Sequence, residues 1–66
     1  MKTMNEKPKC KLIGEDGNVF NLIAIASRTL RRAGQSKAAK EMADRIFQCG
    51  SYDEALAIIQ EYVEVT

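Results

Sequence analysis

The stretch NVFNLIAIASRTLRRAG, residues 18–34, decides the fold. Its apolar residues recur at helical spacing, and at about 100° per residue they gather on one side of a helix. Those residues are Leu22, Ile23, Ala26, Leu30 and Ala33. Asn18 can cap the first turn, and Gly34 can end the helix in a left-handed conformation. The stretch therefore predicts an amphipathic helix over residues 19–33, whose apolar face must pack on other parts of the chain.

Two further segments show the same helical period. Ser36 can cap a second helix over residues 37–48, and Gly50 follows it as a stop signal. The inward residues of that helix would be Ala38, Ala39, Met42, Ala43, Ile46 and Cys49. The letters SYDE, residues 51–54, form a capping box that opens a third helix. Its inner face would be Tyr52, Ala55, Leu56, Ile59 and Tyr62.

Both ends of the chain have the alternation of short strands. In KCKLI, residues 9–13, Cys10 and Leu12 share one face, and in VEVT, residues 63–66, two valines could face the core beside them. The third helix could instead run on to the end of the sequence. With both strands formed, the intervening three helices bring the strands parallel. The predicted fold is a small single α+β domain over residues 9–66, ordered β-α-α-α-β, with a three-helix core. Residues 1–8 are predicted to be a flexible tail.

The small size of the domain favours self-association. A chain of 66 residues buries a smaller fraction of its surface than a larger protein does. Two strands alone make a weak sheet with open edges. Pairing of the sheets across a homodimer would cover an edge and enlarge the core.

Residue content leaves little basis for catalysis or metal binding. The sequence has no histidine, which is the commonest general base and metal ligand, and its two cysteines, Cys10 and Cys49, lie outside any CxxC spacing. We expect free core thiols, no catalytic, cofactor or metal site, and no enzyme activity. No apolar run approaches membrane-spanning length, and the basic start lacks a secretory pattern. These features favour a cytoplasmic protein without a membrane partner.

Charge is distributed unevenly along the chain. Residues 1–40 hold nine Lys and Arg against three acids, and residues 41–66 hold one Arg against six acids. The basic part includes five cations that we expect to be a contact for a protein partner or, as an alternative, for nucleic acid: Arg28, Arg31, Arg32, Lys37 and Lys40. A loose likeness to a helix-turn-helix around Gly34 supports the alternative. The same cations could also be a solvated face with internal pairs such as Glu41 with Arg45.

The corner GEDGN, residues 14–18, is predicted to be a structural turn between strand and helix. Gly14 and Gly17 would permit the turn, Asp16 or Asn18 would cap the helix, and Val19 and Phe20 would begin its buried side. The spacing of oxygen ligands does not fit a calcium loop. A second alternative function, binding of an anion or nucleotide by the amides of this corner, stays open because glycines precede a helix start.

The two ends of the domain carry a resemblance. CKLIGEDGNVF at the start and SYDEALAIIQEYVEV at the end resemble a group of short uncharacterised proteins of Firmicutes-type bacteria and of their phages and plasmids. The resemblance implies an accessory protein of the kind that mobile elements carry, which works by binding, and it transfers no functional residue. Together with the composition, it favours a small non-enzymatic interaction protein that self-associates and binds a protein partner.

Overall fold

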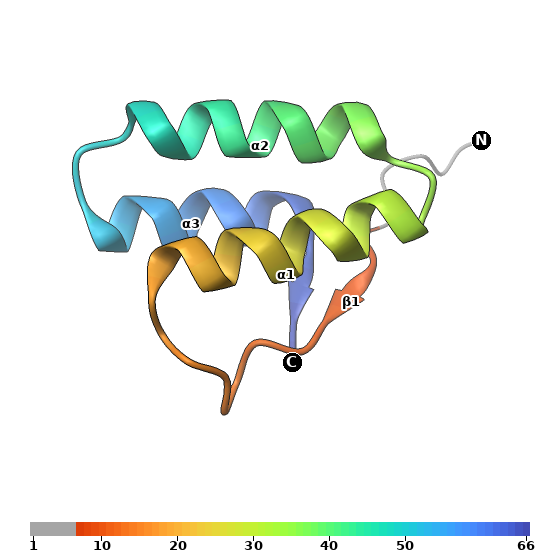
Figure 1. Ribbon diagram of the computed structural model, residues 1–66, viewed down its shortest axis with the longest axis horizontal. Helices are drawn as coiled ribbons and strands as arrows, with labels where there is room; N and C mark the ends of the chain where they lie inside the picture. The colour runs from red at the N-terminus through yellow and green to blue at the C-terminus, as the bar shows by residue number, and fades with distance from the viewer. Residues whose placement is uncertain (1–6) are drawn as a thin grey trace.

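Three helices and a two-stranded parallel sheet make up the computed structural model of the protein, which describes residues 7–66 (Figure 1). Their order is β1 (Lys9–Cys10), α1 (Val19–Arg32), α2 (Ser36–Gln48), α3 (Tyr52–Tyr62) and β2 (Glu64–Val65). The predicted α+β fold, ordered β-α-α-α-β with strands from both ends of the domain, is therefore confirmed.

The predicted flexible tail falls mostly outside the described residues, which exclude 1–6. Its last two positions, however, contact the domain. The carbonyl of Pro8 accepts a hydrogen bond of 2.8 Å from the Glu64 amide, and Lys7 Nζ donates to the Gln60 carbonyl at 2.8 Å. Contacts with the domain thus begin before Lys9, because these two hydrogen bonds join residues 7 and 8 to the end of α3 and the start of β2.

The core lies between the helices and is closed on one side by the sheet. Leu30, Met42 and Ile59, one from each helix, are fully buried. Cys10 of β1 and Val63, which follows α3, are almost as buried, as the alternation of the two strand segments predicted. On α1 the predicted inner residues are buried or half-buried except for Phe20 and, at the other end, Ala33. Ala33 is exposed because the helix ends at Arg32 and Ala33 is its C-cap.

Both ends of α1 are closed by their predicted residues. The Asn18 side chain accepts a hydrogen bond of 2.8 Å from the Phe20 amide. At the other end Gly34 has a φ of 78°, its amide donates to the Arg31 carbonyl, and the Gln35 amide donates to the Leu30 carbonyl. This pair of bonds is a Schellman motif, which satisfies carbonyls that the helix leaves free.

The starts of α2 and α3 differ. The prediction that Ser36 caps α2 is wrong, because Ser36 is already helical and the N-cap residue, Gln35, makes no side-chain cap bond. Ser51 does cap α3, since its hydroxyl accepts from the Glu54 amide at 3.2 Å. The Glu54 carboxylate in turn accepts from the Gly50 amide at 2.7 Å, one residue earlier than in the usual capping box.

The sheet is shorter than the predicted strands. Cys10 is paired with Val65 in parallel register, and the predicted strand over residues 9–13 stops after Cys10. The Leu12 and Ile13 amides both donate to the Thr66 carbonyl at 3.0 Å. Two successive amides on one acceptor cannot continue a regular ladder, so the chain leaves the sheet and turns at Gly14.

Candidate interaction surface

Four large apolar side chains are exposed in the described part of the chain. Their exposed fractions are 69% for Ile13, 66% for Phe20, 65% for Phe47 and 47% for Tyr52. Single exposed apolar residues are common and need no explanation. These four, however, all line two adjoining clefts, and we call them together the cleft surface.

The first cleft, here the aromatic cleft, lies where α1 begins, α2 ends and α3 begins. It has a volume of about 330 Å³. The rings of Phe20 and Phe47 form one wall, with centroids 6.4 Å apart and planes tilted by 36°. Tyr52 contributes another part of the lining, and the deeper residues include Ile23, Ile46 and Ala55. The cleft is therefore an apolar hollow at the point where three helix ends meet.

The second cleft, here the Ile13 cleft, lies between the loop after β1 and α3, with a volume of about 250 Å³. Ile13, Leu22 and Leu56 supply much of its apolar lining. Tyr52 lines this cleft as well as the aromatic cleft, and its hydroxyl donates a hydrogen bond to the Gly17 carbonyl. That bond holds the ring across the gap between the loop and α3, so Tyr52 is a wall shared by both clefts.

The exposure of these side chains corrects two sequence-based expectations. Phe20 was predicted to begin the buried side of α1 and Tyr52 the inner face of α3, but both are exposed. Phe47 had no predicted place on α2. A signal for both phenylalanines was present. Phe20 lies about three turns from Arg31 and Phe47 about two turns from Lys40, so each ring shares a helix side with an exposed cation.

Four carboxylates lie close to the shared wall along the chain or across its hydrogen bond, and one of them lines a cleft. Glu15 lines the Ile13 cleft, and Asp53 and Glu54 follow Tyr52 in the first turn of α3. Asp16 precedes Gly17, whose carbonyl accepts the hydrogen bond from the Tyr52 hydroxyl. No Lys or Arg among residues 7–66 lines either cleft, although Lys7 donates to the carbonyl of Gln60, which lines the Ile13 cleft. The region around Tyr52 is consequently apolar with a negatively charged rim.

The GEDGN corner is a turn stabilised by its own polar groups. The Glu15 amide donates to the Leu12 carbonyl at 3.1 Å, and the Asn18 amide donates to Asp16 Oδ1 at 3.0 Å. The Asn21 side-chain amide donates to the Asp16 carbonyl at 2.9 Å. Of the two candidate caps, Asn18 is the N-cap and Asp16 supports it. The Glu15 and Asn18 amides are thereby occupied, so they are not free to bind an anion.

The five cations predicted as a contact all lie at the other end of the helices. The last turns of α1 and the first turns of α2 carry them, and all five side chains are exposed: Arg28, Arg31, Arg32, Lys37 and Lys40. None of them forms an ion pair within residues 7–66. We call this group the basic face.

The helix pair that carries the basic face is an antiparallel hairpin. Figure 1 shows α2 running back along α1, and contact between Phe20 at the start of α1 and Phe47 at the end of α2 agrees with this. A DNA-reading helix-turn-helix instead has its two helices crossing at a wide angle. The expected likeness to that motif is therefore not found.

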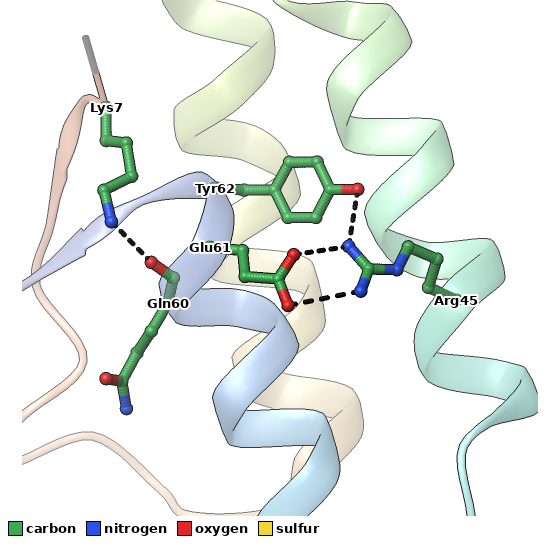
Figure 2. Close-up of polar contacts among 5 residues, drawn as sticks. All are labelled: Lys7, Arg45, Gln60, Glu61 and Tyr62. Carbon is green, nitrogen blue, oxygen red and sulfur yellow. Dashed lines mark hydrogen bonds and ion pairs between the residues drawn. The ribbon is translucent and has the colours of Figure 1, made fainter. Parts of the chain in front are cut away.

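Arg45 has a different partner from the predicted one. Instead of Glu41, it pairs with Glu61 of α3, at 2.7 Å between Arg45 Nη1 and Glu61 Oε1 (Figure 2). The same nitrogen donates to the Tyr62 hydroxyl at 3.1 Å. The hydrogen bond from Arg45 lowers the pKa of Glu61, and the hydrogen bonds to Glu61 and Tyr62 raise the pKa of Arg45. This exposed cluster links α2 to α3 and is structural.

Comparison with known proteins adds no relative. No protein-family model, curated protein or solved structure matches the chain. Within residues 7–66 there is no group of three or more potential metal-ligating side chains. None of the helices described combines the length and the apolar character required to cross a membrane. The cleft surface and the basic face are thus the two features on which a functional proposal can rest.

Proposed function

We propose that the protein is a non-enzymatic interaction module that docks a protein partner on the cleft surface. The observation that carries this proposal is that the exposed large apolar side chains of residues 7–66 all line the two adjoining clefts. Contiguous exposed apolar surface commonly marks a binding site, and aromatic side chains are frequent energetic centres of protein interfaces.

The shape of the surface supports docking of a short segment. Each cleft is open to solvent and bounded by aromatic or branched side chains that a partner's apolar residue would contact. Tyr52 is already held by its hydrogen bond to the Gly17 carbonyl, so little side-chain freedom would be lost there on binding. The proposal retains the expected protein partner but moves its contact from the basic face to the opposite end.

Selection of short random displayed peptides tests the docking function. Three proteins are used as bait: the wild type, a Phe20→Ser with Phe47→Ser variant, and a control with Arg28→Ser and Arg31→Ser. We expect peptides that bind the wild type and the control and do not bind the phenylalanine variant. Circular dichroism checks that all three are folded. Peptides that bind the phenylalanine variant equally well, or no enrichment at all, would overturn the proposal.

Self-association stays a prediction. The strands β1 and β2 are two residues each, so pairing of sheet edges between copies would add few hydrogen bonds. The mass in solution, measured by light scattering at high micromolar concentration, tests it. A mass of one chain would contradict the predicted self-association without affecting peptide docking.

Nucleic-acid binding by the basic face is a second candidate function. It is favoured by five exposed cations at one end of the helices, none in an ion pair among the residues described. Phosphate contacts by such a group would be sensitive to salt and independent of base sequence. Titration of labelled duplex and single-stranded DNA and RNA at two salt concentrations, with wild type and an Arg28→Ala, Arg31→Ala, Arg32→Ala variant, tests it. Absence of binding at low salt would exclude it.

A further inference from the structure

We infer that the cleft surface takes a short segment of another protein with two apolar side chains, one for each cleft, flanked by Lys or Arg. This inference rests on the proposed docking function and adds the chemistry of the partner. It combines the two adjoining apolar clefts with the charge of the residues around their shared wall, Tyr52.

The carboxylates favour a basic partner. Glu15 is in the lining of the Ile13 cleft, whereas Glu54 accepts a hydrogen bond from Gly50 and lines a separate hollow that Arg45 also lines. Asp53 is exposed beside Tyr52. The nearest cation along α2, Arg45, is paired with Glu61 and does not line either cleft. A cation beside the partner's apolar anchors would therefore meet Glu15 or Asp53, while Lys7 is held at the Gln60 carbonyl of the Ile13 cleft.

A second copy of this chain fits the surface less well. In a symmetric dimer the same patch contacts itself, so the carboxylates around Tyr52 would lie opposite each other. In a head-to-tail contact the basic face would approach the rim. That end, however, has no exposed large apolar side chain among residues 7–66 to fill a cleft. The symmetric arrangement therefore lacks opposite charges, and the head-to-tail arrangement lacks an apolar side chain for the clefts.

Three synthetic peptides test the partner chemistry. They share a leucine and a phenylalanine four residues apart and differ only in their flanks, which are Lys, Gln or Glu. Fluorescence anisotropy at low and high salt measures their affinities for the wild type, for Phe20→Ser with Phe47→Ser, and for Glu15→Gln with Asp53→Asn. Neither Glu15 nor Asp53 makes a side-chain hydrogen bond within residues 7–66, so the charge variant should keep its fold.

We expect the Lys-flanked peptide to bind the wild type at least about tenfold more tightly than the Glu-flanked peptide at low salt. The difference should shrink at high salt and in the charge variant, and the phenylalanine variant should bind none of the peptides. Equal affinities of all three peptides, still lost in the phenylalanine variant, would overturn the basic partner and leave the docking function intact. If no peptide binds the wild type, the docking function fails too.

Sedimentation equilibrium tests whether a second copy of this chain, instead of a peptide segment, occupies the clefts. A mass of two chains that falls to one in the phenylalanine variant would show that a second copy occupies the clefts, and would overturn the inference. A mass of one chain, or a mass of two that the phenylalanine variant retains, leaves the clefts free for the peptide and agrees with it.

Discussion

The two ends of the helix hairpin α1–α2 differ in what they expose. One end, at the Gly34 turn, carries the basic face, and the other, where α3 begins, carries Phe20, Phe47 and Tyr52. Helix α1 has 14 residues, so the ends are about 20 Å apart. At the basic end the charges lie in water at little cost. At the cleft end apolar rings lie in water, where burial by a partner would be favourable. The difference places the candidate docking surface at the cleft end.

The largest expected effect compares a buried side chain of α1 with an exposed one. Leu30 is fully buried towards the basic end, and Leu30→Ala should lower the free energy of unfolding by about 2–5 kcal/mol through lost burial and a cavity. Phe20→Ala at the cleft end should change it by only about 0.5 kcal/mol, because the ring is mostly exposed. Urea unfolding measures both. Similar losses would mean that Phe20 is part of the core.

The glycines that follow α1 and α2 make a second comparison. Gly34→Ala should lower the free energy of unfolding by about 1–2 kcal/mol. Gly34 has a φ of 78°, which disfavours any residue with a Cβ even where space is free. Gly50 has no positive φ, and an added Cβ would lie 3.5 Å from Glu54 Oε1, an ordinary contact. Gly50→Ala should therefore be nearly neutral. Thermal unfolding measures the midpoint temperature of both variants. Equal decreases for Gly34→Ala and Gly50→Ala would contradict the explanation by backbone φ.

The serines at the two helix starts give a third comparison. Ser51→Ala should lower the free energy of unfolding by about 1 kcal/mol, since its hydroxyl accepts from the Glu54 amide. Ser36→Ala should have almost no effect, because Ser36 lies inside the first turn of α2 and makes no cap bond. Urea unfolding of both variants checks this. A larger loss for Ser36→Ala would restore its predicted capping role.

The smallest expected effect concerns the Arg45–Glu61 pair, which belongs to neither end. The pKa of Glu61 is lowered in the folded protein, so the pair stabilises fully above the carboxyl's ordinary pKa and loses its effect as pH falls through the folded value. We expect Glu61→Gln to lower the urea midpoint slightly at neutral pH and to match the wild type in acid. Added salt should reduce the difference, because both side chains are exposed. A difference that persists in acid would contradict the ion-pair explanation.

Local patterns in the sequence were sufficient for the helices and most of their ends. Asn18, Gly34 and Ser51 act where their types predict, because a cap or a left-handed turn involves only a few neighbouring residues. The parallel strands also followed from alternation at both chain ends. Ser36 was a local prediction that failed, because the Schellman turn at Gly34 leads directly into α2 and Gln35 takes the cap position.

Only the tertiary structure decided which apolar residues remain in contact with water. Tyr52 is spaced about two turns from buried Ile59, yet it stands at the start of α3 and spans to Gly17 in a distant loop. Phe20 and Phe47 lie on helix sides that also carry exposed cations, but only the packing of α1 against α2 brings their rings together. Arg45 found its partner on α3 instead of on its own helix. The sequence by itself determined the number of helices, most of their ends and most of their buried residues, since these depend on local contacts. The exposure of a side chain and the choice of an ion-pair partner depend on which residues of other elements lie beside it, and only the packing of the elements decides that.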